Sequence, residues 1–203
     1  MRSRQRPLHM IANVQIETDL LYAKQLPAKN GYTWTLASRL GHILRIAEQF
    51  YGPRDTSYTI LGVEFGGAVP QIWFPGACRH IVVQITPQCA TDMQRACYQM
   101  AHESIHLLSP TGIANANTLE EGLAAHFSSR YMLDHFQAVW DNGPGPYQTA
   151  CQHIVQLLAL DEGIIRTLRQ TEPTLSAVTV EQIRAAHADV AAELATALTQ
   201  PFR

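Results

Sequence analysis

The stretch AHESIHLLSPTGIANANTLEEGLAAHFSSRY, residues 101–131, predicts two helices joined by a reversal of the chain. The first helix starts upstream, near Thr91 or Asp92, and ends before Pro110, because proline lacks the N–H that would extend a helix. The segment SPTGIANAN is rich in residues that favour turns, and a second helix opens at NTLEEGLAAHFSS. Side chains of the two helices can therefore face each other.

The rest of the chain predicts strands before this helical pair and more helices after it. Alternating or β-branched segments predict strands at 10–17, 58–65, 70–76 and 80–86. Helical periodicity predicts helices at 33–52, 91–108, 118–138, 147–170 and 179–199. We expect a single domain, residues 1–203, with an α+β fold. Residues 1–90 would form an N-terminal lobe with a mixed β-sheet and one helix, residues 91–203 a mostly helical C-terminal lobe, and a cleft would lie between them.

Composition places the chain among soluble globular proteins. Of its 203 residues, 46% are hydrophobic and 16% are charged, and the formal net charge is −2. The chain therefore has no excess of basic residues for binding nucleic acid, and no apolar run reaches the roughly 20 residues that cross a membrane. Arg2, Arg4 and Arg6 open the chain, but Asn13 and Gln15 interrupt any signal-like apolar run after them. We therefore expect a cytoplasmic protein without nucleic-acid or membrane partners.

The four cysteines form no C-x-x-C pair, so a zinc ion held by cysteines is not expected. In a reducing cytoplasm we expect all four to be reduced residues of the core or its margin: Cys78, Cys89, Cys97 and Cys151.

The first helix of the opening stretch carries a pattern that can bind a metal. His102 and His106 are four residues apart, so both project from one helix face and can chelate one ion. Glu103 lies about 100° further round, close enough to reach a water on that ion. This is the H-E-x-x-H pattern of two zinc ligands and a general base. The alternative interpretation is a helix surface that carries two histidines and a solvated glutamate.

A catalytic zinc of this kind needs a third protein ligand and one open position. Glu120 and Glu121 both qualify. If Asn117 caps the second helix, Glu120 occupies the position that reaches back in a capping box, which leaves Glu121 for the metal. If Thr118 is the cap, Glu121 takes the capping position instead. The face that carries Glu121 has small side chains that would let the two helices approach closely: Ala124, Ala125 and Ser128.

The segments HESIH and TLEEGLAAHF resemble the gluzincin zinc metallopeptidases (HExxH…E), in particular their M1 aminopeptidase-like branch, in a minimal single-domain form. In that branch a helix bearing L-N-E-G-F-A supplies the third zinc ligand, and residues 119–124, LEEGLA, match it. The resemblance therefore implies a zincin-like fold and a zinc ion held by His102, His106 and Glu121. The 14 residues between His106 and Glu121 are fewer than is usual in the family. The resemblance covers residues 90–130, and more weakly up to residue 170.

The same branch carries a tyrosine in a P-Y-x-x-G context at the start of a later helix, where it hydrogen-bonds the developing oxyanion. Residues 146–150, PYQTA, match this context with alanine in place of the glycine. The resemblance thus implies that Tyr147 is the oxyanion donor. The alternative is an ordinary aromatic residue that packs at a helix start. His126 and Tyr131 are other donors that we considered, although both are more typical of packing or surface positions.

This sequence departs from the aminopeptidases in one feature. Their G-A-M-E-N strand holds the free amine of the substrate through its glutamate, and the nearest stretch here is GAVPQ, residues 67–71, with Pro70 at the glutamate position. This difference argues against an aminopeptidase and for an endopeptidase. Zincin enzymes also bind an extended peptide along the edge strand of the sheet, and either 70–76 or 80–86 could be that strand.

The resemblance implies a zinc-dependent metallopeptidase with one Zn²⁺ per chain and a peptide or protein as substrate, cleaved in an active-site cleft between the lobes. Glu103 would take a proton from the zinc-bound water, and Tyr147 would stabilise the oxyanion. A further carboxylate should orient one of the ligand histidines, with three candidates: Asp92, Glu120 and Asp134. The alternative function is a non-catalytic binding or regulatory domain that retains the fold.

Overall fold

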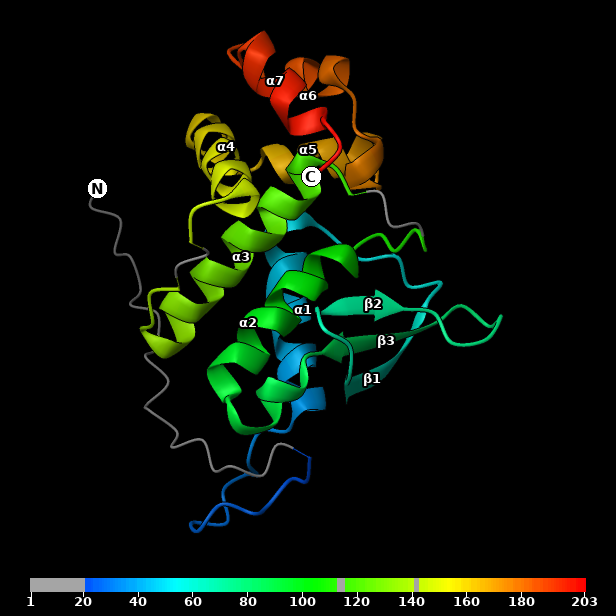
Figure 1. Ribbon diagram of the computed structural model, residues 1–203, viewed down its shortest axis with the longest axis vertical. Helices are drawn as coiled ribbons and strands as arrows, with labels where there is room; N and C mark the ends of the chain where they lie inside the picture. The colour runs from blue at the N-terminus through cyan, green and yellow to red at the C-terminus, as the bar shows by residue number, and fades with distance from the viewer. Residues whose placement is uncertain (1–20, 113–115, 141–142) are drawn as a thin grey trace, which may run out of the picture.

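The computed structural model describes residues 21–112, 116–140 and 143–203, which form an α+β arrangement (Figure 1). The strands are β1 (Thr59–Phe65), β2 (Gln71–Trp73) and β3 (His80–Ile85). The helices are α1 (Leu36–Tyr51), α2 (Met93–His106), α3 (Thr118–Phe136), α4 (Pro146–Leu160), α5 (Ile164–Thr171), α6 (Val180–Ala186) and α7 (Ala192–Thr199). Short 3₁₀ helices, η1 (Pro87–Thr91) and η2 (Leu175–Ala177), precede α2 and α6. The strand predicted at 10–17 lies outside the described residues.

The three strands form one mixed sheet in the order β1-β3-β2. β1 runs parallel to β3, and β2 runs antiparallel to it, with Ile72 opposite Val83. Of the two segments predicted as the edge strand, 70–76 therefore contains an edge strand. The alternative, 80–86, is wrong because β3 pairs with a strand on each side. Pro70 and Pro75 flank β2, as expected where a strand leaves one side unpaired.

The core joins the sheet to the helices. Along β3, Ile81, Val83 and Ile85 are fully buried, and the residues between them are partly exposed. This alternation turns one face of the sheet toward α1 and α2. α1 contributes a buried stripe at helical spacing, and the same core cluster continues as far as Leu198 of α7. α2 contacts both α1 and α3, so the helix with the two histidines lies at the centre of the packing.

The helical pair predicted at 91–108 and 118–138 is confirmed. Asp92 caps α2 by accepting a hydrogen bond of 2.9 Å from the Arg95 N–H. Asn117 caps α3 by accepting one of 2.9 Å from the Glu120 N–H, so the frame with Thr118 as cap is wrong. The helix predicted at 33–52 is also confirmed as α1, with a capping box between Thr35 and Ser38.

Two predicted helices are each broken in the structure. The segment 147–170 contains α4 and α5, because Asp161 leaves the helical conformation and its carboxylate accepts a hydrogen bond from the Gly163 N–H. The segment 179–199 contains α6 and α7, because His187 adopts an extended conformation. Its ring nitrogen and its carbonyl then accept bonds from the N–H groups of Asp189 and Val190, respectively.

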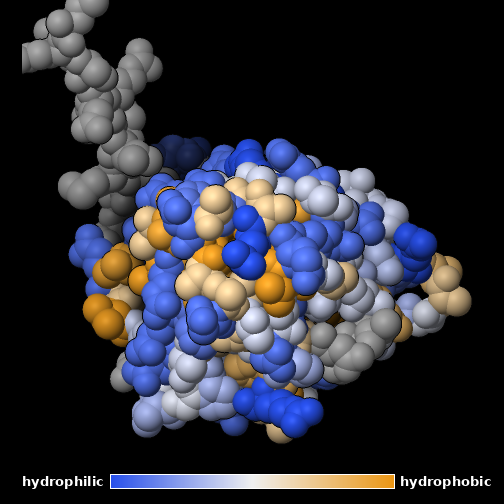
Figure 2. All heavy atoms as spheres, turned by 90° about the horizontal axis from the view of Figure 1, so that it is seen from above, coloured by the Kyte–Doolittle hydropathy of each residue, from blue (hydrophilic) through white to orange (hydrophobic). Residues whose placement is uncertain are grey.

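The cysteines follow the prediction with one exception. Cys89 and Cys97 are buried and Cys151 is half-buried, but Cys78 is exposed between β2 and β3, so its assignment to the core was wrong. Seen from the end where α6 and α7 lie, the surface mixes polar and apolar side chains (Figure 2). Within the described residues, no helix combines the length and the apolar character that a membrane span requires.

Candidate metal centre

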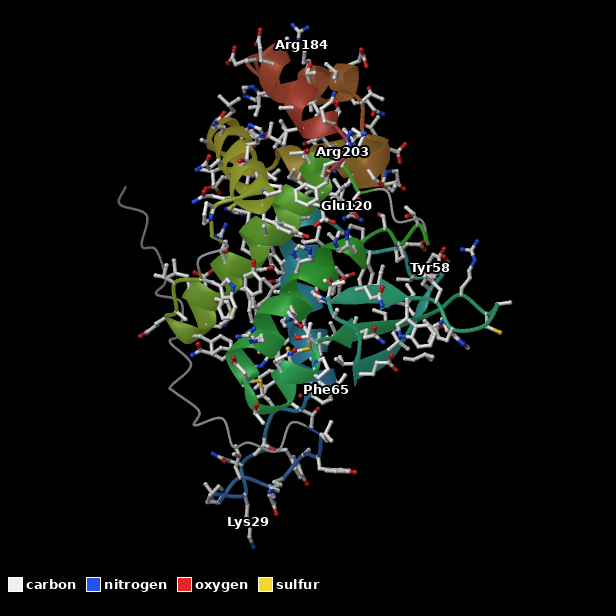
Figure 3. All side chains as sticks on the ribbon, viewed as in Figure 1. Lys29, Tyr58, Phe65, Glu120, Arg184 and Arg203 are labelled. Carbon is white, nitrogen blue, oxygen red and sulfur yellow. The ribbon has the colours of Figure 1, made fainter. Side chains whose placement is uncertain are left out.

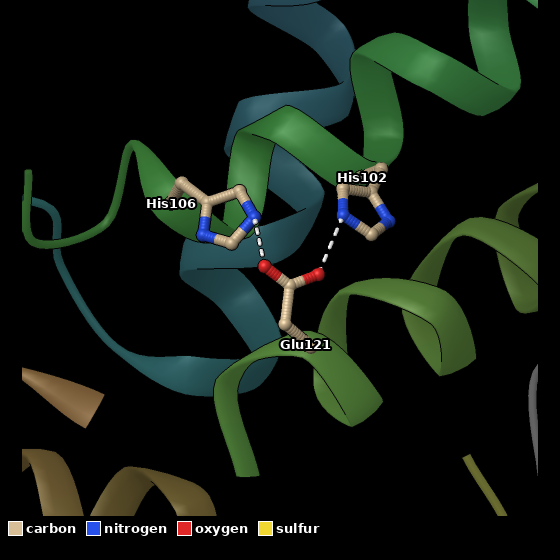
Figure 4. A group of neighbouring side chains, drawn as sticks. All are labelled: His102, His106 and Glu121. Atoms are coloured by element: carbon tan, nitrogen blue, oxygen red, sulfur yellow. Dashed lines mark hydrogen bonds and ion pairs between the residues drawn. The ribbon is translucent and has the colours of Figure 1, made fainter. Parts of the chain in front are cut away.

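α2 presents His102 and His106 on one face. The two residues are one helical turn apart, and their ring centroids are separated by 5.3 Å. His102 is only 9% exposed, and His106 is half-buried. The rings therefore point away from bulk solvent, toward the first turn of α3 (Figure 4).

Glu121, in the first turn of α3, faces both rings (Figure 4). Its Oε2 lies 3.1 Å from Nε2 of His102, and its Oε1 lies 3.6 Å from Nε2 of His106. One ligand atom can be taken from each of the three residues so that these atoms all lie within 4.8 Å of one another. The structure thus brings together the three residues that were predicted as metal ligands.

The geometry of the three residues fits a zinc ion. Tetrahedral bonds of about 2.0–2.1 Å place neighbouring ligand atoms about 3.3 Å apart. Oε2 of Glu121 lies 3.1 Å from His102 Nε2 and its Oε1 lies 3.6 Å from His106 Nε2, both near that value, and one ligand atom from each of the three residues lies within 4.8 Å of the others. Two imidazole nitrogens and one carboxylate oxygen are also a donor set of catalytic zinc sites, in which a fourth position stays open.

Glu120 is the second carboxylate at this centre. Its Oε1 lies 2.8 Å from Nδ1 of His106, so this ring can donate to Glu120 and keep Nε2 for a metal. The predicted reach of Glu120 back to the cap of α3 is therefore wrong, because its carboxylate faces α2. The other two candidates for this role have partners elsewhere. Asp92 pairs with Arg95, and Asp134 pairs with Arg130.

Charge and burial act together on the centre as it stands without metal. Burial alone would lower the pKa of His106, but its hydrogen bond to Glu120 and the charges of Glu103 and Glu121 raise it to about 10. Burial would raise the pKa of Glu121, but His102 and His106 hold it below its usual value. Glu121 is therefore ionised and His106 carries a proton that a metal must displace.

Glu103 is almost completely buried, with 3% of its surface exposed. Burial raises the pKa of its carboxyl group, and the nearby histidines His106 and His102 only partly oppose this effect. Among the described residues, no hydrogen-bond donor is paired with this side chain. The raised pKa of this carboxyl group favours its taking up a proton.

A cavity of about 1120 Å³ adjoins the centre, and both histidines and all three carboxylates line it. One wall is formed by residues 69–72, which include the first part of the edge strand β2. The other walls come from α2, the beginnings of α3 and α4, and the C-terminal residues. The GAVPQ stretch thus reaches the cavity through Val69, Pro70 and Gln71.

Tyr147 lies at the start of α4 and also lines the cavity. Its ring centroid is 5.8 Å from that of His102 and 4.6 Å from that of Phe202. Burial, followed by the charges of Glu121 and Glu103, raises the pKa of its phenol to about 12, so the hydroxyl keeps its proton at neutral pH. The structure therefore brings this predicted donor to the metal centre.

The two other donors that the sequence offered lie elsewhere. Tyr131 is buried on the far part of α3, where its hydroxyl contacts His42 at 3.1 Å and Arg39 at 3.5 Å. His126 does not line the cavity, and its buried Nδ1 has no partner among the described residues.

Sequence reasoning missed two contributors to the site. Phe202 reaches the cavity from the C-terminal segment after α7, and no motif marks it. Gly122 allows α4 to approach α3, because a Cβ atom at this position would lie 2.5 Å from the Ala150 carbonyl oxygen. The glycine of LEEGLA was visible in the sequence, but its partner on α4 was not.

No protein-family model matches the chain, and neither the curated proteins nor the solved structures compared with it contain a match.

Proposed function

We propose that the chain is a zinc-dependent metallopeptidase of gluzincin type with a zincin-like fold, and that it acts as an endopeptidase. The observation that carries the proposal is the position of Glu103, a buried carboxylate in the wall of the same cavity as an N,N,O ligand set. A structural metal site needs ligands but no adjacent base. A hydrolytic site needs both.

The order of elements supports the zincin-like assignment. An antiparallel edge strand lies beside a parallel pair, and the helix with the first two ligands follows the central strand. The third ligand comes from the next helix, in the first turn after its cap. These features agree with the expectation drawn from the HESIH and LEEGLA segments.

Each side chain of the centre has a role in this proposal. A zinc ion held by His102, His106 and Glu121 would lower the pKa of a bound water toward 7 and polarise the substrate carbonyl. Glu103 accepts the proton of the attacking water and delivers it to the leaving amine. The Tyr147 hydroxyl donates to the carbonyl oxygen as negative charge develops on it.

The edge strand supports a peptide as substrate. β2 pairs with β3 on one side only, and residues 69–72 form a wall of the cavity. An extended peptide can add to such an edge through backbone hydrogen bonds, which places its own carbonyl groups along the cavity. Strand addition uses hydrogen bonds to the backbone of the peptide and requires no free chain terminus, so it suits cleavage within a polypeptide.

The charges in the cavity agree with an endopeptidase. Its acidic side chains are Glu103, Glu120 and Glu121, and all three belong to the metal centre. The arginine that lines the described walls, Arg95, is paired with Asp92 at 3.2 Å. Glu120, Glu121 and Arg95 are therefore paired within the chain before a substrate with a free ammonium or carboxylate terminus arrives.

The experiment that tests the proposal begins with the metal content of the purified chain by mass spectrometry. We expect about one zinc per chain and its loss in His106→Ala. A peptide library then identifies a cleaved sequence, and Glu103→Gln should keep the zinc while activity falls about 100- to 10,000-fold. Glu162→Gln, at an exposed position between α4 and α5, is the matched control and should retain full activity.

Two results would contradict the proposal. A chain that binds no zinc even when zinc is supplied would show that HESIH is an ordinary helix surface. A chain that binds zinc but cleaves nothing would favour the alternative, a binding or regulatory domain with a metal as a structural element.

A further inference from the structure

The C-terminal segment Gln200–Phe202 is attached to the helix that carries the third ligand. Pro201 forms an antiparallel bridge with Asn117, the cap of α3. The Thr118 N–H donates to the Gln200 carbonyl at 2.9 Å, and the Phe202 N–H donates to the Ala116 carbonyl at 3.1 Å. Figure 3 labels Glu120 of α3 and Arg203, the residue after this segment.

These bonds fix the ring of Phe202 at the cavity. Phe202 lines the cavity wall, and its ring centroid lies 4.6 Å from that of Tyr147 at an interplanar angle of 50°. The contact falls in the range of favourable aromatic pairs. The Tyr147 ring in turn lies 5.8 Å from His102 in an edge-to-face arrangement.

Packing, rather than a hydrogen bond, holds Tyr147 in place. The residue is 41% exposed and its hydroxyl is paired with no group of the described residues. It occupies the first turn of α4, next to Pro146 at the start of the helix. The ring contacts with Phe202 and His102 are therefore what can restrain the direction of the hydroxyl.

We propose that Phe202 is a positioning residue for Tyr147, held by the Gln200–Phe202 segment so that the tyrosine hydroxyl stays at the metal end of the cavity. This inference rests on the proposed peptidase function. Phe202 makes no contact with the substrate in this role. It restricts the orientations of the Tyr147 side chain before the reaction begins. Less conformational freedom is then lost when the hydroxyl bonds to the carbonyl oxygen that becomes negative.

The test is a double-mutant cycle on a peptide that the wild-type chain cleaves. Phe202→Ala should lower kcat about tenfold and leave KM unchanged, because the contact acts on a group used in the transition state. In a Tyr147→Phe background the same substitution should change kcat by less than about twofold. Phe202→Tyr keeps the ring and should restore kcat, whereas Phe202→Leu, which keeps the apolar bulk and protects the fold, should not.

A binding measurement separates this role from a general loss of structure. By calorimetry, Phe202→Ala should bind an N-acetylated phosphinic dipeptide, a tetrahedral mimic, about tenfold more weakly. Its affinity for acetohydroxamate, which requires little beyond the metal, should stay at the wild-type value. Thr196→Ala is the matched control, since Thr196 lies at an exposed position of α7 and does not line the cavity, and it should match the wild type with both probes.

The outcomes distinguish the two proposals. A wild-type chain that binds zinc but cleaves no peptide would overturn the proposed function and this inference with it. A wild-type chain that cleaves peptides, with equal losses from Phe202→Ala in both tyrosine and phenylalanine backgrounds, would overturn only the role of Phe202.

Discussion

Glu120 Oε1 lies 2.8 Å from Nδ1 of His106, and this contact makes the two adjacent glutamates of α3 unequal. Glu121 faces the Nε2 atoms of both histidines, whereas Glu120 faces the opposite nitrogen of one ring. In the proposed zinc site, the first arrangement suits a ligand. The second is that of a carboxylate that orients a ligand and makes it more basic.

This difference predicts unequal effects on zinc affinity. Glu121→Gln removes an anionic ligand and should abolish stoichiometric zinc binding, whereas Glu120→Ala should weaken zinc binding about 10- to 100-fold. Glu120→Gln keeps an oxygen that can accept from Nδ1, so its loss should be smaller. Competition with a chromophoric chelator measures all three variants. A larger loss of zinc affinity in Glu120→Ala than in Glu121→Gln would reverse the assignment of ligand and orienting residue.

Zinc affinity should depend steeply on pH. Burial lowers the pKa of His106, but the Glu120 hydrogen bond and the neighbouring carboxylates raise it to about 10 in the metal-free chain. Below that pKa the imidazole holds a proton that zinc must displace, so affinity should rise about tenfold per pH unit between about pH 6 and about pH 8. Calorimetry in buffers of different ionisation enthalpy should detect about one released proton per zinc.

Glu120→Gln provides the control for that pH dependence. Without the charged partner, the His106 imidazole loses its proton at lower pH, so the slope of affinity against pH should decrease. A wild-type affinity that stays flat across the same range would show that His106 is already neutral in the metal-free chain.

Local signals explain what the sequence could predict. Asp92 and Asn117 are capping residues that bond to the N–H group three positions further on, and each is one of the two candidates that the sequence offered for its helix start. The spacing of His102 and His106 follows from helix geometry alone. The DEG turn at 161–163 was also a local signal, and the prediction of one long helix there overlooked it.

Contacts between distant segments explain what the sequence could not predict. Glu120 satisfied a plausible local pattern, yet its carboxylate bonds to a residue fourteen positions away on another helix. Phe202 reaches the cavity only because its segment pairs with residues 116–118. Such pairings depend on how whole elements pack, and no short-range rule contains that information.

The close approach of α3 and α4 predicts that Gly122→Ala is destabilising. A Cβ atom there would lie 2.5 Å from the Ala150 carbonyl oxygen and 2.9 Å from Ile154 Cγ1, so α4 must move away. We expect the free energy of unfolding to fall by about 1–3 kcal/mol in urea denaturation. Since α4 carries Tyr147, kcat should fall as well.

Gly41→Ala is the matched control, because Gly41 lies within α1 and a Cβ atom there would meet nothing within 4 Å. This change should raise the free energy of unfolding by up to about 1 kcal/mol through helix propensity. Equal effects at positions 41 and 122 would contradict a packing role for Gly122.

Arg169 predicts a large contribution to stability from a position far along the chain. Arg169 is 8% exposed, and its guanidinium group donates to carbonyl oxygens at the ends of two helices: Tyr51, Gly52 and Pro53 at the end of α1, and Leu108 after α2. The carbonyl groups at a helix end lack partners within the helix. Arg169 therefore joins the end of α1 to the end of α2, just beyond His106.

Arg169→Lys should lower the free energy of unfolding by about 3 kcal/mol or more, because one ammonium group cannot reach carbonyls from both helix ends and leaves buried acceptors unpaired. Arg166 is the matched control on the same helix, since it also donates to carbonyl groups at the end of α1, those of Gln49 and Phe50, but it is exposed. Arg166→Lys should cost less than about 1 kcal/mol. Urea denaturation of both variants measures the difference. Because the end of α2 positions His106, Arg169→Lys should also weaken zinc binding, and an unchanged zinc affinity would show that Arg169 acts on stability alone.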